Sequence, residues 1–299
     1  MKRGILVFNP AAGGPGSALR MKGVVERARL VGVELEEHPT TAPGTATAIV
    51  AAALRSAPDL IVVAGGDGTV GEAAAALAGT STPLAILPYG TANVLARECG
   101  IGASPRRAER FLASRKTRAI TAWIAAERVC CMWMGVGLDA RMMKSVQPAL
   151  KRGLGRTGIA WTAVGDFLRY DFPPIRVDGI DPGGGRFRHE ATFVVAANIQ
   201  RYGGEMKIAP SADPEDELLD LVLFTGTTKA ALMRFLVDIA MGRMGRADVP
   251  NVIRLRAREM TAHAVGPQEV DVQVDGDFVG TTPATIGPVV GRVNIVVPE

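Results

Sequence analysis

The sequence predicts an α/β domain with a parallel sheet, followed by a domain built as an antiparallel β-sandwich. Through about residue 120 the chain repeats one pattern three times: an apolar strand, a turn that contains glycine, and a helix. Strands that alternate with helices favour right-handed crossovers and a parallel sheet. After about Thr121 apolar and polar residues alternate in short runs, which is typical of an antiparallel sandwich or barrel. We therefore expect domains at residues 1–121 and 122–299, with the last residues free to return to the first domain.

The three strand–turn–helix segments of the first domain begin at Gly4, Leu60 and Leu84. They read GILVFNPAAGGPGSALRMKGVVERARLVG, LIVVAGGDGTVGEAAAALAG and LAILPYGTANVLARECGIG. In a parallel sheet, ligands bind outside the carboxyl ends of the strands. The three glycine turns should therefore lie close together, facing an active-site cleft between the two domains.

The second domain is predicted from five runs with a period of two, separated by turn residues. These runs are FRHEATFVVAAN, LLDLVLF, IRLRAREMTAHAV, VDVQVDGDFVG and RVNIVV. Successive side chains of a strand point to opposite faces, so each run offers one apolar face to a core. Two helical insertions interrupt the runs, at residues 139–170 and 229–242, and residues 178–187 form a loop by composition.

Composition and charge limit the classes of protein to consider. With 47% hydrophobic and 21% charged residues, the 299-residue chain has the composition of a folded soluble protein. No apolar stretch approaches the roughly 20 residues that cross a bilayer, and three cysteines give no disulfide framework, so we expect a cytoplasmic protein. No Cys/His pair has zinc-ligand spacing. The formal charge of +4 permits an acidic partner, but no groove-reading module is present and nucleic acid is not expected.

The glycine turns have the composition of phosphate-binding loops, since backbone N–H groups at a helix N-terminus favour an anion. Neither common nucleotide fingerprint is present: there is no GxxxxGK[ST], and no GxGxxG opens a helix. One glycine cluster after a strand is usually a structural turn. Three clusters at corresponding places favour a phosphate site instead.

Asp67 stands in the middle of the second glycine turn, where a carboxylate repels phosphate unless a cation lies between them. Mg²⁺ is bound by one or two carboxylates together with phosphate groups, so Asp67 predicts the chemistry of a magnesium-bound nucleotide. The alternative is that Asp67 only caps the following helix, a role that Thr69 can also fill. Glu72, about one turn later, can support the metal or accept a hydrogen bond from a loop amide.

Six stretches together resemble the diacylglycerol kinase catalytic-domain family, which includes the sphingosine and ceramide kinases and soluble bacterial lipid kinases. They are FNPAAGGPG in the first turn, GGDGT at 65–69, LPYGTANVLAR at 87–97, GVGLDA at 135–140, NIQRYGGEMKIAP at 198–210 and VDGD at 274–277. GGDGT alone is shared with NAD kinases and phosphofructokinase-like enzymes, whereas the set is specific and runs from end to end. The resemblance implies an ATP-dependent kinase that transfers the γ-phosphate of Mg-ATP to a hydroxyl of a membrane lipid, either diacylglycerol or a sphingoid or ceramide-type lipid.

The resemblance also implies that ATP binds between the two domains, at the loops of the first. Carried over position by position, the nucleotide contacts are Asn9, Thr40, Gly65, Gly66, Asp67, Gly68, Thr69, Val70, Gly71, Glu72, Gly90, Thr91 and Asn93. Val94 stands where many relatives have Asp, and Gly71 stands where Asn is frequent. Neither departure changes Asp67 or the glycines of the turn, so we expect the nucleotide site to remain.

Phosphoryl transfer to a hydroxyl also needs a group that accepts or orients the hydroxyl proton. The resemblance places this acid in VDGD, where the family has Asp-Gly-Glu. Asp275 is the expected general base, and Asp277, which stands where Glu is usual, is the alternative; Asp67 completes the catalytic set. By pattern alone, Asp-Gly between alternating residues is a hairpin turn.

A second acidic stretch, APSADPEDELLDLVLF, leads into a predicted strand. Asp213, Asp216 and the carbonyl of Leu218 match the spacing of a structural Mg²⁺ site in bacterial members of the family. Glu217 stands where Gly is common, which changes the turn. The alternative is an ordinary solvated acidic loop.

The helical insertion at 139–170 combines basic and large apolar residues. The basic ones are Lys144, Lys151, Arg152, Arg156 and Arg169, and the apolar ones are Met142, Met143, Leu150, Leu154, Ile159, Trp161 and Phe167. Such a segment suits an interfacial helix on anionic lipid, so we expect reversible, peripheral binding to an anionic membrane surface; an amphipathic helix packed on the β-domain is the alternative. Two other functions stay open: a kinase of a soluble acceptor such as NAD or a sugar, and a catalytically inactive, nucleotide-sensing lipid-binding protein.

Overall fold

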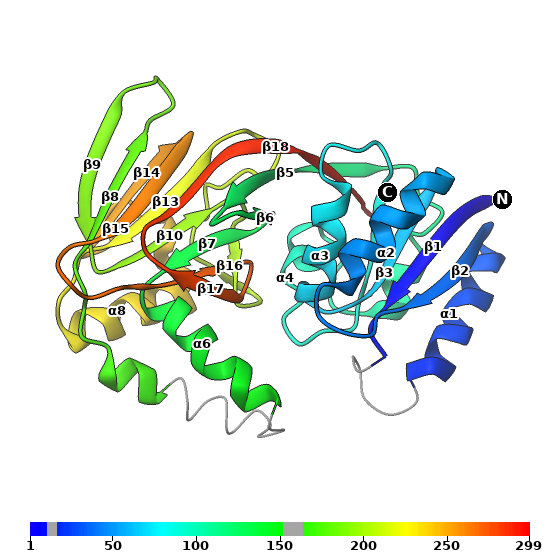
Figure 1. Ribbon diagram of the computed structural model, residues 1–299, viewed down its shortest axis with the longest axis horizontal. Helices are drawn as coiled ribbons and strands as arrows, with labels where there is room; N and C mark the ends of the chain where they lie inside the picture. Colours follow the sequence, from blue (N-terminus) through cyan, green and yellow to red (C-terminus); the bar gives the residue numbers. More distant parts are fainter. Residues whose placement is uncertain (11–16, 152–163) are drawn as a thin grey trace. The chain divides into compact units, whose positions relative to one another are not determined.

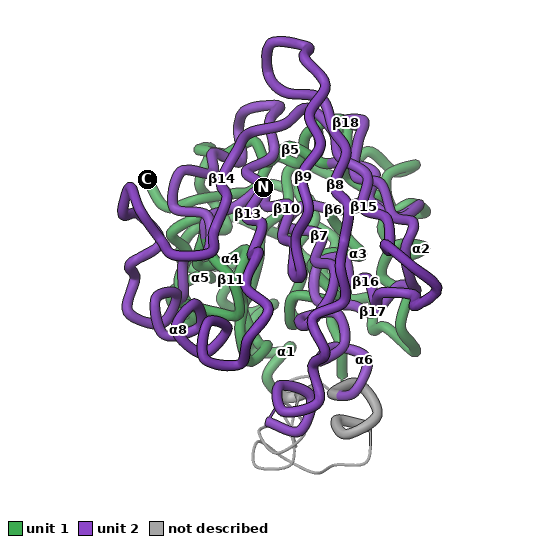
Figure 2. The backbone as a smooth tube through the Cα atoms, turned by 90° about the vertical axis from the view of Figure 1, so that its left-hand side faces the viewer, with its two compact units in different colours: residues 1–122, 201–205, 290–299 green, residues 123–200, 206–289 purple. Residues whose placement is uncertain are grey.

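The structure of the protein is a computed structural model that describes residues 1–10, 17–151 and 164–299 (Figure 1). The chain forms two compact units, shown in two colours in Figure 2. Unit 1 contains residues 1–122, 201–205 and 290–299, and unit 2 contains residues 123–200 and 206–289. Two strands, β5 (Thr117–Ala125) and β18 (Ala284–Val296), therefore have residues in both units.

Unit 1 is built on a parallel sheet. Its strand order is β2-β1-β3-β4-β18, with bounds β1 Lys2–Phe8, β2 Val33–Pro39, β3 Leu60–Gly65 and β4 Leu84–Pro88. The all-apolar β3 is buried along its whole length, as expected of a central strand of a parallel sheet. At the edge, β2 alternates buried and exposed residues at its start, and this strand lies outside the three predicted repeats.

The helices of unit 1 are α1 Ser17–Leu30, α2 Thr45–Ala53, α3 Asp67–Leu77, α4 Val94–Glu98 and α5 Pro105–Glu109, with a 3₁₀ turn at Leu54–Ser56. The helices α1, α3 and α4 follow the three predicted strands, whereas α2 follows the unpredicted β2. Val24, Val50, Ala73 and Leu77 are fully buried, so α1, α2 and α3 each have a face in the core of the unit.

Unit 2 contains two antiparallel sheets. One has the order β14-β13-β10-β7-β16-β17, and the other pairs β18 with β15, β15 with β8, and β8 with β9. The strands are β6 Arg128–Cys130, β7 Trp133–Val136, β8 Ile175–Ile180, β9 Arg186–Ala191, β10 Phe193–Ala197, β13 Leu219–Phe224, β14 Val252–Ala257, β15 Glu259–Ala264, β16 Asp271–Val274 and β17 Asp277–Thr281. A further short strand of unit 2 is β12 Met206–Lys207, whereas the short strand β11 Arg201–Tyr202 belongs to unit 1. One apolar cluster joins residues of both sheets, including Val194, Leu221, Val177 and Met260. The predicted fold class, a parallel α/β sheet followed by an antiparallel sandwich, is confirmed.

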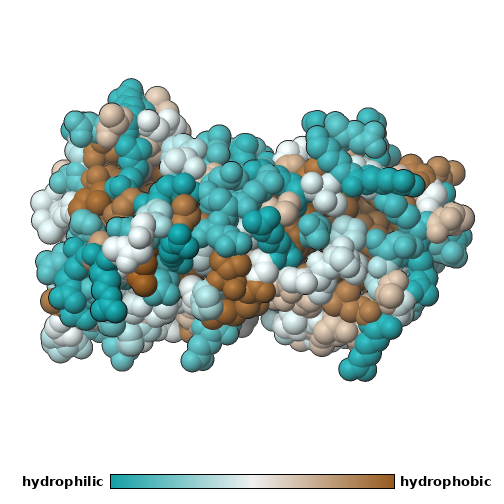
Figure 3. All heavy atoms as spheres, turned by 90° about the horizontal axis from the view of Figure 1, so that it is seen from above, coloured by the Kyte–Doolittle hydropathy of each residue, from teal (hydrophilic) through white to brown (hydrophobic). Residues whose placement is uncertain are grey.

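The helices of unit 2 are α6 Leu138–Lys151, a helical segment at 164–169, α8 Lys229–Ala240 and a 3₁₀ turn at Arg243–Gly245. The helix predicted at 229–242 is confirmed by α8. Of the insertion predicted at 139–170, residues 152–163 lie outside the described residues. None of the described helices is long and apolar enough to span a bilayer. On the face drawn in Figure 3, hydrophobic residues are interspersed with hydrophilic ones.

Candidate functional site

Four loops continue the parallel strands of unit 1 at the carboxyl edge of the sheet. Thr40 N–H donates to the last carbonyl of β1 at 2.8 Å, Asn9 N–H donates to β3 at 3.2 Å, and Tyr89 N–H donates to Gly65 at 2.9 Å. These bonds extend the sheet ladder by one residue on each strand. The loops that carry the predicted nucleotide contacts therefore lie side by side, as parallel topology requires.

The glycine turns after β3 and β4 touch through their backbones. A Cβ built on Gly90 would lie 2.5 Å from Gly66 Cα, and a Cβ on Gly66 would lie 3.2 Å from Gly90 Cα. Gly65 is similarly covered, since its Cβ would lie 2.9 Å from the Cβ of Thr69. Real Cβ atoms essentially never approach other atoms to less than about 3.0 Å, so glycine at positions 65 and 90 allows the two loops to pack as one surface.

Gly68 has no such packing requirement. A Cβ on Gly68 or on Gly71 would meet no protein atom within 4 Å. Gly68 is exposed in the first turn of α3, and Thr91 is exposed in the turn after β4. Val70 N–H donates to the carbonyl of Gly66 at 3.0 Å and so begins the helix, with the Val70 side chain buried beneath it.

Asn93 holds the turn after β4 in shape. Its Oδ1 accepts from Gly90 N–H at 2.9 Å, and its Nδ2 donates to the Gly90 carbonyl at 2.8 Å. The backbone of Asn93 has φ 49, the left-handed region that Asn tolerates better than most residues. The side chain is buried, so the predicted contact residue Asn93 also fixes the loop from within.

Asp67 joins the two glycine turns. Its Oδ1 accepts from Val94 N–H at 2.7 Å, at the start of α4 rather than of its own helix α3. Burial raises the pKa of Asp67, and the N–H groups of residues 93–95 partly offset that rise. The carboxylate thus caps a neighbouring helix at the same edge as the glycine turns, and not the following helix α3, which was the capping alternative that the sequence left open.

Glu72 caps a second neighbouring helix. Its Oε1 accepts from Gly44 N–H at 2.7 Å and its Oε2 accepts from Ala46 N–H at 3.0 Å, at the start of α2. Thr47 Oγ1 also donates to the Glu72 carbonyl at 2.9 Å. Of the two roles suggested by the sequence, the structure shows the bonds to loop amides.

Asp275 lies in unit 2, in the hairpin turn between β16 and β17. Asp275 and Gly276 have φ 51 and φ 91, so both central residues are left-handed, as a type I′ turn requires. The hairpin predicted from Asp-Gly is therefore confirmed. The turn also aims the Asp275 carboxylate at the chain segment that precedes β7.

That segment wraps the carboxylate with donors. Asp275 accepts from the N–H groups of Cys131 at 2.8 Å, Met132 at 2.9 Å and Trp133 at 3.0 Å, and from the Cys130 thiol at 3.2 Å. Burial raises the pKa of Asp275 and the amides partly offset the rise. Burial and the nearby Asp275 charge keep the pKa of Cys130 well above that of a free thiol, so Cys130 stays a donor.

A side-chain relay supports the same turn. Asp139, at the start of α6, accepts from Gln273 Nε2 at 2.9 Å, and Gln273 Oε1 accepts from Gly276 N–H at 2.8 Å. Gly135 makes room, because a Cβ there would lie 1.8 Å from Asp139 Oδ2. The sequence contained one signal for this relay, the GVGLDA stretch, but assigned no role to its Asp. Asp277, in contrast, is exposed on β17.

The acidic loop before β13 binds within itself and to an arginine. Asp213 Oδ1 accepts from Glu215 N–H at 3.1 Å, and Asp216 Oδ1 accepts from Leu218 N–H at 2.9 Å. The other oxygen of Asp216 is bonded to the guanidinium of Arg256. Among the described residues, no three His, Cys, Asp or Glu side chains group closely enough to hold a metal ion. Any metal at Asp213, Asp216 and Leu218 would share Asp216 with Arg256.

Two family models match consecutive parts of the chain. The diacylglycerol kinase catalytic domain matches residues 3–123, and the YegS C-terminal NAD kinase beta sandwich-like domain matches residues 133–297. The second match covers more than half of the chain, and the two together span both units.

Curated relatives and solved structures agree with these matches. A diacylglycerol kinase of Mycobacterium tuberculosis is 28% identical over 299 residues, which covers 97% of this chain and 94% of the relative. A diacylglycerol kinase of Bacillus subtilis is 27% identical, covering 100% of this chain and 97% of the relative. A crystal structure of a diacylglycerol kinase from Bacillus anthracis has the same fold, with a TM-score of 0.75 at 20% identity over 100% of this chain and 97% of that chain. The chain therefore belongs to the diacylglycerol kinase catalytic-domain family and is a kinase.

Proposed function

We propose that this protein transfers the γ-phosphate of Mg-ATP to a hydroxyl of a membrane lipid, diacylglycerol or a sphingoid or ceramide-type lipid. The observation that carries the nucleotide half of the proposal is the joined glycine surface of unit 1. Gly66 and Gly90 pack backbone to backbone, while Gly68 has open space where a side chain would stand. Bare N–H groups at a helix start, beside open space, are suited to phosphate oxygens.

The lipid half of the proposal rests on the relatives. The Mycobacterium tuberculosis and Bacillus subtilis proteins named diacylglycerol kinase align with nearly the whole of this chain. The coverage includes the β-sandwich, so the alignment is not confined to the nucleotide loops. The family model that matches the β-sandwich is described as NAD kinase beta sandwich-like, so NAD is the soluble acceptor to test beside the lipids.

Asp67 fits a magnesium ligand. Carboxylate oxygens are the ligands that Mg²⁺ prefers, and Asp67 stands at the glycine edge with its orientation set by Val94 N–H. When bound, Mg²⁺ neutralises charge on the phosphate oxygens.

Asp275 is our proposed general base. A base must be ionised at working pH and must hold its orientation, and four donors hold this carboxylate. Three of the four donors bond Oδ1, and Oδ2 accepts from Cys131 N–H, so Oδ2 is the less heavily used oxygen. Asp277 remains the alternative, since its carboxylate is exposed two residues away.

The membrane contact we propose includes α8 as well as the insertion at 139–170. Lys144 of the insertion pairs with Asp271 at 2.8 Å, so this residue packs on the β-domain. Lys229 Nζ donates to the Phe167 carbonyl at 2.7 Å and links α8 to the 164–169 helix. The apolar residues on these two helices that are between 43% and 65% exposed are Val164, Leu168, Met233 and Val237, and Met241, directly after α8, is 62% exposed. Figures 1 and 2 show α6 and α8 at the same end of unit 2.

Vesicle sedimentation tests this contact. The double variant Val237→Glu/Met241→Glu should sediment less with vesicles that contain anionic lipid, because two glutamates oppose both apolar insertion and charge attraction. The matched control is Val265→Glu/Val290→Glu, which places the same two charges at valines that are 42% and 43% exposed and lie on neither helix. Equal sedimentation of all three proteins would contradict membrane contact through α8.

The activity test measures transfer of labelled γ-phosphate from Mg-ATP to a panel of lipids in mixed micelles, with NAD as the soluble acceptor. Asp67→Asn keeps an oxygen for Val94 N–H and removes the charge. Its matched control is Asp59→Asn. Asp59 directly precedes β3, at the end of the strand opposite to Asp67, and its carboxylate also accepts a backbone N–H at 2.7 Å. We expect labelled lipid from wild type and Asp59→Asn, and a loss of about 100-fold or more from Asp67→Asn.

Each other outcome selects a different function. Labelled NAD without labelled lipid would replace the lipid kinase by a soluble-acceptor kinase. Bound ATP without any labelled product would favour an inactive nucleotide sensor. Equal activity of Asp67→Asn and wild type would remove Asp67 from the catalytic set.

A further inference from the structure

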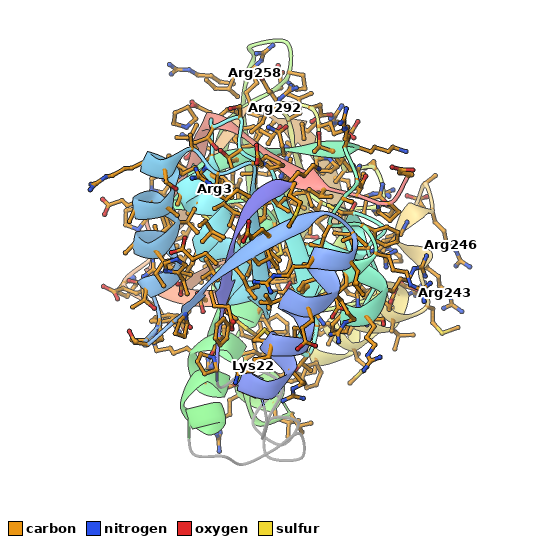
Figure 4. The ribbon with its side chains drawn as sticks, turned by 90° about the vertical axis from the view of Figure 1, so that its right-hand side faces the viewer. Arg3, Lys22, Arg243, Arg246, Arg258 and Arg292 are labelled. Atoms are coloured by element: carbon orange, nitrogen blue, oxygen red, sulfur yellow. The ribbon has the colours of Figure 1, made fainter. Side chains whose placement is uncertain are left out.

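A cavity of about 330 Å³ lies in unit 1 beside the turn after β4, between α1 and α5. Figure 4 faces this side of the unit and labels Lys22 on α1. The cavity is lined by Arg20, Gly23, Arg27, Tyr89, Pro105 and Arg106. We call it the arginine pocket. None of its lining residues belongs to the predicted nucleotide, metal or catalytic sets.

Arg27 is held in a fixed orientation at this pocket. Its Nε and Nη2 both bond the carboxylate of Glu109, Nη2 at 2.9 Å, and Glu109 is only 5% exposed. The remaining nitrogen, Nη1, lies 2.8 Å from where a Cβ of Gly23 would stand. Gly23 therefore leaves the space that Nη1 occupies, and the guanidinium edge that Glu109 does not use lies on the pocket side.

Tyr89 receives the electrostatic effect of all three arginines. Burial and Glu109 raise the pKa of the phenol, while Arg27, Arg20 and Arg106 oppose the rise. The phenol stays protonated at neutral pH and is a hydrogen-bond donor. Arg20 and Arg27 of α1 and Arg106 of α5 line the same cavity as Tyr89, so three guanidinium groups from two helices are grouped near one ring.

The pocket has a charge and a size that select a class of ligand. Three guanidinium groups line the cavity, whereas two carboxylates act on Arg27, those of Glu109 and Glu26, so the group keeps a net positive charge. A phosphate monoester carries close to two negative charges at neutral pH. The volume of about 330 Å³ is at the small end of the range of small-molecule pockets, so a compact ligand fits.

We propose that the arginine pocket binds a phosphate monoester dianion. Arginine presents planar pairs of N–H donors that match phosphate oxygens, and the Tyr89 hydroxyl adds one neutral donor. The ester group can belong to a soluble metabolite or to the headgroup of a phosphorylated lipid, since both present the same dianion.

The pocket adjoins the nucleotide loops without sharing their residues. Tyr89 directly precedes Gly90, whose backbone packs on Gly66. A ligand that fixes Tyr89 would therefore act on the turn that Asn93 closes. The inference does not rest on the lipid acceptor proposed above, because it concerns a pocket of unit 1 alone.

Calorimetric titration of the full chain tests the proposal, with glycerol 3-phosphate as the soluble probe and phosphatidate vesicles, compared with phosphatidylcholine vesicles, as the headgroup probe. Arg106→Gln removes one guanidinium of an exposed residue and should weaken binding roughly 10- to 100-fold, the worth of one charge-assisted hydrogen-bonded pair. Lys22→Gln, on α1 but outside the pocket, removes the same charge and should bind like wild type. Circular dichroism confirms that both variants fold.

Binding of either probe that depends on Arg106 and not on Lys22 supports the proposal, and the probe that binds identifies the source of the ester. Equal affinity of wild type and Arg106→Gln overturns it, as does the absence of binding by both probes. Equal weakening by Lys22→Gln shows general attraction to a basic surface and also overturns it. Displacement of glycerol 3-phosphate by saturating ATP overturns it too, since the probe would then occupy the nucleotide site.

Discussion

Replacing Gly68 by alanine separates the folding role of the glycine turn from its binding role. A Cβ on Gly68 would meet no protein atom within 4 Å, whereas a Cβ on Gly90 would lie 2.5 Å from Gly66 Cα. Gly68 therefore has no steric role within the folded chain. If phosphate oxygens approach its N–H, the methyl group would enter the space that the ligand needs.

The expected effects on stability and binding have opposite signs. Gly68 lies in the first turn of α3, and alanine in a helix is more favourable than glycine by up to about 1 kcal/mol. We expect Gly68→Ala to raise the free energy of unfolding by roughly 0.5 kcal/mol, less than the full value because helix ends fray. Hydrogen bonds to a charged group contribute about 1.5–3 kcal/mol each, so loss of one should weaken ATP binding roughly 10- to 100-fold.

Urea unfolding and equilibrium ATP binding measure the two effects on the same protein. The matched control is Gly165→Ala in the 164–169 helix, where the nearest atom to a new Cβ is 3.8 Å away. That variant should leave the dissociation constant for ATP unchanged. A Gly68→Ala protein with wild-type stability or better and a dissociation constant within about threefold of wild type would refute close approach of phosphate to this loop.

Three other predictions follow from the acidic side chains. Glu72→Gln should lower the free energy of unfolding by about 1–2 kcal/mol, because the side-chain amide keeps one acceptor oxygen for the two N–H groups at the start of α2. Amide hydrogen exchange at the start of α2 should become faster, and unchanged exchange would contradict the capping role. If Asp275 is the base, kcat should fall as pH falls through a pKa above the ordinary value of about 3.9, because only the ionised carboxylate accepts a proton and burial raises its pKa; Asp277→Asn should keep that acid limb, and its loss would transfer the role to Asp277. For the proposed metal site at Asp213, Asp216 and Leu218, millimolar Mg²⁺ should raise the Tm of wild type and not that of Asp216→Asn, since binding to the folded state stabilises it. An equal change of Tm in both proteins would contradict a metal at this loop, and Arg256 would then be the cation that neutralises Asp216.

The strands of unit 1 that the sequence predicted, β1, β3 and β4, are buried over most or all of their length. Residues 60–65 are apolar throughout because both faces of a central parallel strand are covered, and that property is visible in a window of six residues. The edge strand β2 was not among the three predicted repeats, because its alternation VELEEHP lacks a following glycine turn of the same kind. The turn at Asp275 and Gly276 was predictable, since a two-residue hairpin depends on local dihedral preference.

The partners of the acidic residues depended on tertiary structure. Asp67 caps a helix that begins 27 residues later, and Asp275 accepts from amides more than 140 residues earlier. No local pattern contains such pairings, because the order of strands in the sheets decides which loop ends adjoin.

The sequence by itself therefore determined the fold class and the positions of the glycine turns, since periodicity and turn chemistry are properties of neighbouring residues. Only the tertiary structure decided how each carboxylate is used and where arginines from α1 and α5 meet at Tyr89. The physical reason is that a buried carboxylate takes whichever N–H donors the topology brings to it, and topology is set by the packing of the whole chain.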